Sequence, residues 1–579
     1  MKEIKIRKES SIRLLWLLVL LIIFIKSIIL LISLYSFNTY VILFGIFAFM
    51  PILFFLSFSS LFSERGQLFY LFGLNLFISI LFFADIIYAR AFGHLISIYM
   101  IFAKGVTEDL SMSIISLIKW TDFLMFIDLP FIFALALKSK KNIKNIKKII
   151  NKNIVEFLIM SILSVGIICY QFTDIENGKG FGLGNLRYQA LTMSPIGYHL
   201  FDLYKYIYER PIELEPEHTE KIDDWLSNNA KYQVPSDNYA YLEGYLKDKN
   251  IIVVQFESLE SILIGNSYFG QEIMPNINRI LKNSIYFNNI YEQVRDGNSS
   301  DAELLFNTSV YPINSGSTFL RFGDNAYNSL PNLLEHEGYT SVAIHGDDKE
   351  FWNRNRVFPA LGFNRYIAED EFDNKTNGGM GILDESLFKQ SLLEIEKLKE
   401  PYYLFIITLT SHMPFNAAAD IGCLELPNDD ETSRYLQTIN YTDRVFGAFY
   451  NELGKNGMLD NTVLIIYGDH EGIHKYYDTK LPNNNLKIPF IIHIPGIEGQ
   501  VIDITGGQVD MMPTVAYLLG IERGEYATGV MGRNLLGNGA GGVLLPDGNL
   551  IGRIEDEDHI RESQDIADIL IRGNYFNVK

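Results

Sequence analysis

The sequence predicts a bundle of five membrane-spanning helices followed by an α/β domain with a central, mostly parallel sheet. Three observations lead to this prediction. Residues 1–170 are apolar and carry 17 Lys and Arg against 9 Asp and Glu, whereas the remainder carries 32 against 59. The first part contains apolar runs of about 20 residues, the length that a helix needs to cross a bilayer. From Asn250 onward, short apolar runs alternate with amphipathic stretches, which is typical of α/β domains.

Five apolar segments are expected to span the membrane. They are Leu14 to Leu34, Val41 to Phe62, Leu68 to Tyr88, Ile114 to Leu137 and Ile154 to Tyr170. The first segment has a basic start and no small-residue cleavage site, so we expect it to remain as an uncleaved helix. Buried charges in spans can mark transport or relay sites, but several of those here lie close to span ends, where snorkelling or an interfacial position is the simpler explanation. The charged residues concerned are Asp85, Lys119, Asp122, Asp128 and Glu156.

The loop between the last two spans predicts the orientation of the chain. Residues 138–152 contain seven lysines and no acidic residue. By the positive-inside rule, this loop and the amino terminus are cytoplasmic, and five crossings then place everything after Tyr170 outside the cell. We therefore expect a transmembrane domain over residues 1–170, a juxtamembrane helical connector over 171–246 and an extracellular domain over 247–579.

The composition of the second part restricts its partners. Its strongly acidic balance argues against nucleic acid, because the phosphates would be repelled. The two cysteines, Cys169 and Cys423, lie in different parts of the chain, so a disulfide between them is not expected.

Two expected strands end at residues that suit a divalent cation. The run from Ile251 to Phe256 is followed by Glu257, and the run from Val463 to Ile466 leads to Asp469 and His470. Ligands of open α/β sheets gather at the carboxyl ends of strands, where carboxylates and an imidazole can share a metal ion. Taken alone, Glu257 could equally cap the next helix, and the Asp469–His470 pair could be an ordinary surface pair.

A third candidate lies at the start of an expected helix. Gly297 and Asn298 make a tight turn, and Ser299 or Ser300 would lie at the N-cap of a helix beginning around Asp301. A hydroxyl at this place faces free backbone N–H groups and suits an anionic phosphate. Capping competes with nucleophilic catalysis as the explanation, and the roles can be divided, with Ser299 reacting and Ser300 capping.

Two further expected strands, over 339–344 and 403–410, also lead to polar residues. Arginine offers fork-like donors to phosphate oxygens, and tryptophan offers an apolar wall. The residues that follow these strands are His345, Asp347, Trp352, Arg354 and His412. A helix over 433–453, a strand over 487–494 and a packing helix over 508–520 complete the expected domain.

Five motifs follow one another along this domain. They are FESLES at 256–261, GNSSDAE at 297–303, HGDDKEFWNR at 345–354, TSHMPF at 410–415 and YGDHEG at 467–472. Together with the five apolar spans, these motifs resemble the lipoteichoic acid synthase family of Gram-positive bacteria, within the alkaline phosphatase and sulfatase superfamily. The resemblance implies a sulfatase-like fold for the extracellular domain, which would be catalytic.

The resemblance also implies roles for the candidate residues. Glu257, Ser299, Asp469 and His470 would hold a metal ion, usually Mn²⁺, with Mg²⁺ as the other candidate. The family's nucleophile is a threonine, and this chain has Ser299 at that position. The residues expected around the glycerol phosphate group are His345, Asp347, Trp352, Arg354 and His412.

The expected reaction is a metal-dependent transfer of glycerol phosphate through a covalent intermediate on Ser299. The donor would be phosphatidylglycerol in the membrane, and the acceptor a glycolipid anchor or a growing polyglycerolphosphate chain. A phosphoethanolamine transferase of the same superfamily is the nearest alternative, although those proteins generally carry several disulfides. A non-catalytic sensor or scaffold with a decayed site is another alternative, and a membrane transporter a weaker one.

Overall fold

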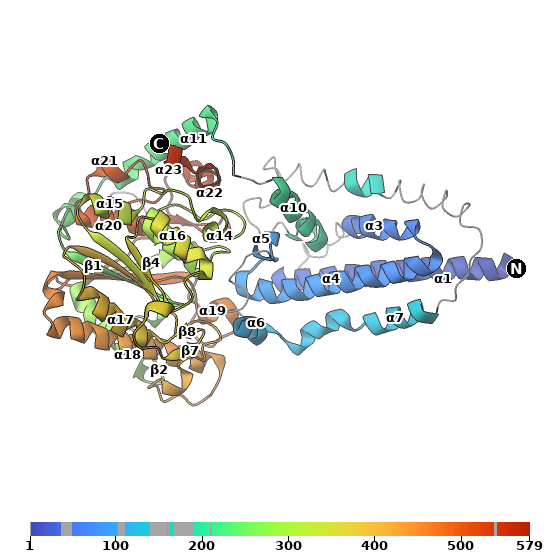
Figure 1. The fold of residues 1–579 in the computed structure, drawn as a ribbon, viewed down its shortest axis with the longest axis horizontal. Helices are drawn as coiled ribbons and strands as arrows, with labels where there is room; N and C mark the ends of the chain where they lie inside the picture. Colours follow the sequence, from blue (N-terminus) through green and yellow to red (C-terminus); the bar gives the residue numbers. More distant parts are fainter. Residues whose placement is uncertain are drawn as a thin grey trace. The chain divides into compact units, whose positions relative to one another are not determined.

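The computed structural model describes residues 2–35, 49–101, 111–138, 193–208, 211–537 and 541–578, together with 159, 161–166, 169 and 190–191. The chain forms two compact units (Figure 1). One unit consists of residues 1–101 and 114–209, and the other of residues 102–113 and 210–579. The division after residue 209 falls inside the segment expected to connect the two domains.

The amino-terminal unit is helical. Two of its apolar stretches, Leu14–Tyr35 and Arg65–Phe92, are long enough to cross a membrane, and Phe49–Leu61 is a shorter apolar helix. The expected spans over 41–62 and 154–170 lie partly outside the described residues. The helices in this part of the chain are α1 (Lys2–Tyr35), α3 (Phe49–Ser57), α4 (Glu64–Phe92), α5 (Ile98–Ile101), α6 (Ser111–Leu117), α7 (Leu129–Lys138) and α10 (Pro195–Tyr208).

The expected span over 114–137 is not one continuous helix. The chain leaves α6 after Leu117, forms a 3₁₀ segment over Trp120–Phe126 and begins α7 at Leu129. Asp122 stabilises the first break, because its Oδ2 accepts a hydrogen bond from the backbone N of Lys119 at 2.8 Å and pairs with Arg90 at 2.6 Å. A proline, the second residue of α7, favours a helix start at the second break because its ring cannot follow a preceding helical turn.

Several charged residues of the helical unit are paired. Lys26, which is 4% exposed, contacts Asp128 at 2.6 Å and also donates to Asn75 at 3.1 Å. Asp85 is fully buried and contacts His199 at 2.8 Å. Asp85 and Asp128 therefore have specific partners within the unit, and the expectation that they merely reach an interface was incomplete.

The second unit is built around a nine-stranded sheet with the order β12-β4-β11-β10-β1-β9-β5-β6, in which β13 also pairs with β4. The pairs of β1 with β10 and β9 are parallel, as are those of β5 with β9 and β6, while β11 is antiparallel to both of its neighbours. The strands are β1 (Asn250–Phe256), β2 (Ser267–Tyr268), β3 (Gln271–Glu272), β4 (Ser284–Tyr291), β5 (Thr340–His345), β6 (Arg365–Ile367), β7 (Asn377–Gly379), β8 (Gly381–Ile382), β9 (Tyr402–Ile407), β10 (Thr462–Gly468), β11 (Lys487–His493), β12 (Gln500–Ile502), β13 (Gly506–Gly507), β14 (Gly542–Leu544) and β15 (Leu550–Gly552). The predicted α/β domain with a mostly parallel sheet is confirmed.

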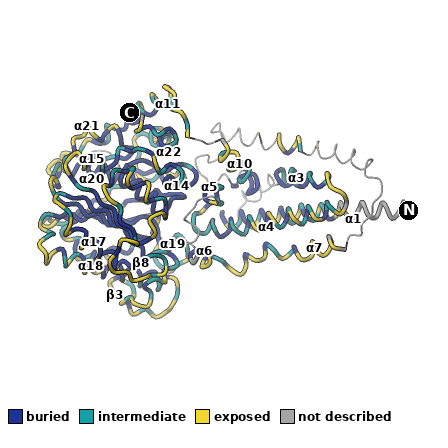
Figure 2. Tube along the Cα trace, viewed as in Figure 1, coloured by how far each residue is buried: buried dark blue, intermediate teal, exposed yellow. Residues whose placement is uncertain are grey.

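Helices cover both faces of this sheet (Figure 1). On one face, Ile251 and Val253 of β1 pack in a core with Phe306 of α13 and Met511 of α20. On the other face, Phe256 lies edge-on against Phe446 of α18. Figure 2 shows that the central strands are buried along their length. The helices of this unit are α11 (Pro216–Asn229), α12 (Pro275–Ile280), α13 (Ser299–Thr308), α14 (Thr318–Phe322), α15 (Leu330–His336), α16 (Arg354–Ala360), α17 (Asp384–Ile395), α18 (Glu431–Lys455), α19 (Ile473–Tyr476), α20 (Met511–Leu519), α21 (Arg523–Tyr526), α22 (Glu557–Arg572) and α23 (Tyr575–Val578).

One long strand near the edge of the sheet was not predicted. β4 has two adjacent asparagines, Asn288 and Asn289, which interrupt the apolar pattern that signals a strand. Its pairing with β11 and β12 stabilises it instead. Because the parallel strands β1, β5, β9 and β10 all point the same way, the residues that follow them meet at one edge of the sheet.

Candidate active site

Ser299 is the first residue of α13, and the turn before it has an unusual backbone. Asn298 is the N-cap residue, with φ 47° and ψ −119°, and its side chain makes no capping hydrogen bond. Ser300 Oγ donates to the carbonyl of Gly297 at 2.6 Å and so does not cap the helix. The helix thus begins two residues earlier than expected, and neither serine caps it. The Ser299 hydroxyl is left available for other contacts.

Asp301 holds this turn together. Its Oδ2 accepts backbone hydrogen bonds from Arg295 at 2.9 Å and from Gly297 at 3.0 Å. A Cβ added at Gly297 would lie 2.1 Å from Asp301 Oδ1, so the turn closes only with a glycine at this position. The sequence places Asp301 in the same motif as Ser299, but its role depends on the fold of the turn.

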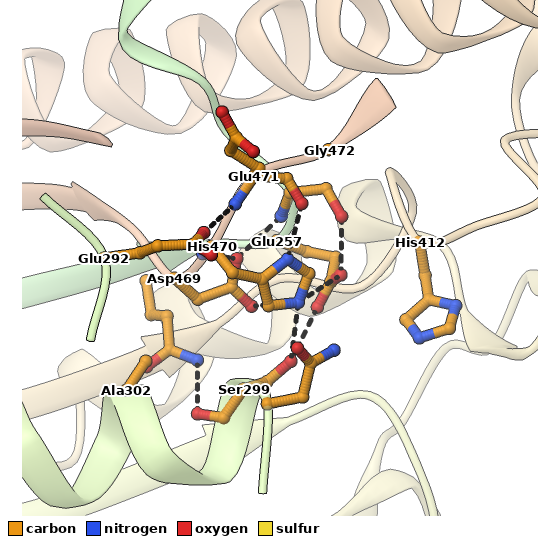
Figure 3. A network of polar contacts seen from close by, with 12 residues as sticks. Glu257, Glu292, Ser299, Ala302, His412, Asp469, His470, Glu471 and Gly472 are labelled. Atoms are coloured by element: carbon orange, nitrogen blue, oxygen red, sulfur yellow. Dashed lines mark hydrogen bonds and ion pairs between the residues drawn. The ribbon is translucent and has the colours of Figure 1, made fainter. Parts of the chain in front are cut away.

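Glu257, Asp469 and His470 come together next to the Ser299 hydroxyl (Figure 3). One potential ligand atom from each of the three lies within 4.8 Å of the others. Ser299 Oγ donates to Glu257 Oε2 at 3.1 Å and lies 3.5 Å from His470 Nε2. Asp469 and His470 are fully buried, so they are not a surface pair, and Glu257, only 3% exposed, does not cap a helix.

Neighbouring backbone groups orient these side chains. His470 Nδ1 lies 2.8 Å from the carbonyl of Glu471, which directs Nε2 toward Ser299. Asp469 Oδ1 accepts from the backbone N of Ser258 at 2.7 Å and of His470 at 2.8 Å. Asp469 Oδ2 is buried and has no hydrogen-bond partner among the described residues. The cluster therefore contains a buried carboxylate oxygen, Asp469 Oδ2, that lacks a hydrogen-bond donor in the described part of the chain.

The electrostatics of the cluster fit a divalent cation. Burial raises the pKa of Asp469 well above its usual range, and the adjacent charge of Glu257 raises it further. Burial also raises the pKa of Glu257. Two buried carboxyl groups side by side are unfavourable as anions unless a positive charge lies between them. With the serine hydroxyl and the imidazole, this donor set offers ligands to one divalent cation.

A second group of candidates follows β5. His345 Nδ1 lies 3.0 Å from the carbonyl of Ile407, and its Nε2 is buried with no hydrogen-bond partner in the described chain. Burial, followed by the charge of Arg354, holds the pKa of His345 well below its usual range. Arg354 binds Glu303, and Asp347 Oδ1 accepts from the backbone of the following residue at 2.8 Å. Trp352 is buried and has φ 55°, a conformation that is uncommon for a bulky residue.

His412 follows β9 but makes no direct contact with the cluster. Its Nδ1 lies 2.7 Å from the carbonyl of Met413, and Figure 3 shows its ring apart from the hydrogen-bonded network around Ser299. Burial lowers the pKa of His412, while the charges of Asp469 and Asp347 act in the opposite direction. The structure thus brings Glu257, Ser299, Asp469 and His470 together and leaves His412 apart from them.

Sequence reasoning missed Lys475. This residue lies in α19, just after the YGDHEG motif, and its Nζ donates to Asn298 Oδ1 at 2.5 Å. Its positive charge lowers the pKa of Glu257 and of Glu292, opposing the effect of burial. Its position soon after the expected metal ligands Asp469 and His470 could have marked Lys475 as a candidate in the sequence. Only the fold shows that it reaches the turn before Ser299.

Comparison with known proteins gives consistent matches to both parts of the chain. Residues 1–211 match the family model described as lipoteichoic acid synthase N-terminal domain, and residues 249–521 match the model described as sulfatase. A lipoteichoic acid synthase of Staphylococcus saprophyticus is 30% identical over 489 residues, which cover 79% of this chain and 73% of that protein. Lipoteichoic acid synthase 2 of Bacillus subtilis is 30% identical over 502 residues, covering 82% and 75%. A crystal structure of the lipoteichoic acid synthase LtaP from Listeria monocytogenes superimposes with a TM-score of 0.52 at 27% identity, covering 61% of this chain and 98% of that one.

Proposed function

The chain belongs to the lipoteichoic acid synthase family, and from this premise we propose that it transfers glycerol phosphate from phosphatidylglycerol to a glycolipid anchor or a growing lipoteichoic acid chain. One observation supports this proposal most directly. The Ser299 hydroxyl lies 3.1 Å from Glu257 and 3.5 Å from His470, at the edge of a buried cluster whose donor atoms suit a divalent cation.

Glu257, Ser299, Asp469 and His470 are the proposed metal ligands, and Mn²⁺ is the proposed ion, with Mg²⁺ as the alternative. When bound, the ion lowers the pKa of the Ser299 hydroxyl and offsets the charge of the phosphate. The chain contributes the geometry. α13 fixes the position of Oγ, and the carbonyl of Glu471 fixes the His470 ring with Nε2 toward it.

The proposed first step is attack of Ser299 Oγ on the phosphorus of phosphatidylglycerol. A P–O bond to Ser299 forms, the P–O bond to diacylglycerol breaks, and a proton passes to the departing diacylglycerol oxygen. Arg354 binds the non-bridging oxygens of the phosphate, and His345, Asp347 and Trp352 surround the glycerol phosphate group. The enzyme is left as a glycerophosphoryl-Ser299 intermediate.

In the second step, a glycerol hydroxyl of the acceptor attacks the same phosphorus and Ser299 Oγ leaves. His412 is the proposed partner for proton exchange with the leaving and attacking oxygens. Its lowered pKa keeps the imidazole neutral at pH 7, which suits acceptance of the proton from the attacking hydroxyl.

The amino-terminal apolar helices fit a protein that acts on a lipid. We propose that residues 1–170 cross the membrane five times, with the amino terminus in the cytoplasm. Residues 171–246 would connect them to an extracellular catalytic domain over 247–579. This arrangement gives the catalytic domain access to phosphatidylglycerol in the outer leaflet.

The test uses the purified full-length protein with fluorescent phosphatidylglycerol and Mn²⁺, with and without a glycolipid acceptor. We expect diacylglycerol release by the natural protein and a loss of at least 100-fold in Ser299→Ala, because the nucleophile is removed. The matched control is Ser267→Ala, which changes an exposed serine in β2 and should keep full activity.

The products separate the possible outcomes. One added glycerol phosphate unit identifies a primase, and long chains identify a synthase. Full activity in a folded Ser299→Ala protein would overturn the nucleophile assignment. No release by the natural protein with any acceptor would favour the alternative of a non-catalytic sensor or scaffold, and transfer from phosphatidylethanolamine instead would favour a phosphoethanolamine transferase.

A further inference from the structure

Arg354 is held by a carboxylate on the helix that carries Ser299. Its Nε lies 3.1 Å from both carboxylate oxygens of Glu303, and its Nη2 lies 2.6 Å from Glu303 Oε1. Glu303 is fully buried and Arg354 is 1% exposed. Burial opposes the charge of Arg354, but the charge of Glu303 and these hydrogen bonds outweigh it and raise the pKa of the guanidinium. The pair is therefore a side-on contact sealed from water.

This contact leaves one end of the guanidinium without a partner. Arg354 Nη1 is buried and has no hydrogen-bond acceptor among the described residues, and the same is true of His345 Nε2. A buried charged donor without an acceptor is costly, so the site is built for an acceptor that the chain itself does not supply. A phosphate oxygen has the charge and geometry for Nη1.

The position of Glu303 links this donor to the nucleophile. Glu303 follows Ser299 by four residues in α13, so both side chains lie on the same face, about 6 Å apart along the helix axis. The helix is buried along its whole length and packs against α20, which restricts its movement. The spacing between Ser299 Oγ and the Arg354 guanidinium is therefore determined by one rigid element.

We propose that Glu303 is a positioning residue for the transfer reaction. It fixes Arg354 through Nε and Nη2, so that Arg354 binds the phosphate through Nη1 alone and not through two guanidinium nitrogens. The distance of Nη1 from Ser299 is fixed by the same contact. Glu303 also balances the charge of Arg354. The pair therefore orients the phosphate through the direction of the Nη1 hydrogen-bond donor more than through its net charge. This inference rests on the proposed function.

The first test is a double-mutant cycle in the full-length protein, with diacylglycerol release from fluorescent phosphatidylglycerol as the readout. We expect Glu303→Gln to lower kcat roughly 10–100-fold, because the carboxylate that accepts the hydrogen bonds of Arg354 becomes a neutral amide. The KM should stay within threefold or fall, since Arg354 gains net charge. Glu303→Gln combined with Arg354→Ala should be no slower than Arg354→Ala alone, because Glu303 acts through Arg354.

A matched control separates positioning from loss of stability. Asp443→Asn changes another fully buried carboxylate, one that accepts hydrogen bonds from Asn276 and Ile277 outside the site. Its melting temperature should fall as in Glu303→Gln, while its kcat stays within threefold of the natural protein. If Glu303→Gln does not fold, Glu303→Asp replaces it in the same cycle, with a smaller expected loss of kcat.

Two results would overturn the inference while leaving the proposed function intact. One is natural activity in a folded Glu303→Gln protein. The other is additivity, in which the double variant loses the full factor of each single variant. By contrast, a natural protein that releases no diacylglycerol would refute the proposed function itself, so the two failures are distinguishable.

Discussion

At the scale of single residues, the turn before Ser299 carries local strain. Asn298 has φ 47° and ψ −119°, a conformation that costs about 1–3 kcal/mol and persists only where its surroundings impose it. Lys475 supplies one such restraint, through the 2.5 Å hydrogen bond from its Nζ to Asn298 Oδ1. Asp301 supplies another, by accepting the backbone N–H of Gly297. A turn restrained in this way fixes the position of the next residue, Ser299, and of its hydroxyl.

We predict that Lys475→Met lowers kcat for diacylglycerol release by roughly 10-fold, because it removes a charge-assisted hydrogen bond at the turn before the nucleophile. The measurement is the fluorescent phosphatidylglycerol assay, accompanied by the melting temperature. Lys480→Met is the matched control, since Lys480 is exposed on the same segment and should tolerate the change. An unchanged kcat in Lys475→Met would show that Asn298 keeps its conformation without the lysine.

At the scale of elements, α13 concentrates much of the site in two turns. Its first residue is the proposed nucleophile, its third holds the preceding turn, and its fifth binds Arg354. Every residue of α13 is buried, including four with polar or charged side chains in its first five positions. Buried polar groups on a helix are costly unless each has a partner, so their presence here reflects contacts outside the helix.

The turn that leads into α13 depends on Gly297, and we predict that Gly297→Ala reduces activity by at least 10-fold. The added methyl group would lie 2.1 Å from Asp301 Oδ1 and 2.8 Å from Ser300 Oγ, so the turn must move. We also expect a loss of about 1–3 kcal/mol in the free energy of unfolding, as in other overpacked sites.

The control for this substitution is Gly524→Ala. An added Cβ at Gly524 meets nothing within 4 Å, and the residue lies in the short helix α21. Diacylglycerol release and thermal unfolding are measured for both variants. Equal activity in the two would mean that the turn adapts and that its geometry does not limit the reaction.

At the scale of the whole molecule, the charge distribution separates a basic apolar part from an acidic one. Residues 1–170 have a net charge of +8, and the remaining residues a net charge of −27. An acidic surface does not attract a phospholipid headgroup, so we attribute substrate access to the membrane anchor rather than to long-range steering. The local positive groups at the site, Arg354 and Lys475, act at short range.

The proposed orientation can be tested with a cysteine that the chain already has. Cys423 is exposed in the second unit, and in a Cys169→Ser protein it is the single thiol. We predict that a membrane-impermeant maleimide labels it in intact cells as fully as after lysis. A cysteine introduced by Lys144→Cys into the lysine-rich loop, in a protein lacking both natural cysteines, should be labelled only after lysis. The reverse pattern would place the second unit in the cytoplasm.

Much of the sheet was predictable because its strands are buried on both faces and appear as apolar runs. β1, β5, β9, β10 and β11 were expected close to where they lie. β4 was not expected, since its asparagines hide the signal and only its partners stabilise it. In the helical unit, length and hydropathy predicted α1 and α4, whereas the breaks over 114–137 depend on a contact with Arg90 that lies far away in the sequence.

For the site, the sequence by itself determined which residue types follow each parallel strand, and the common direction of those strands implied that they meet. It could not determine their distances or partners. Only the tertiary structure decided that Ser299 is the first residue of its helix, that Lys475 reaches the preceding turn and that Glu303 fixes Arg354. The physical reason is that strand and helix patterns depend on local spacing, whereas a hydrogen bond between residues far apart in the chain depends on how the whole unit packs.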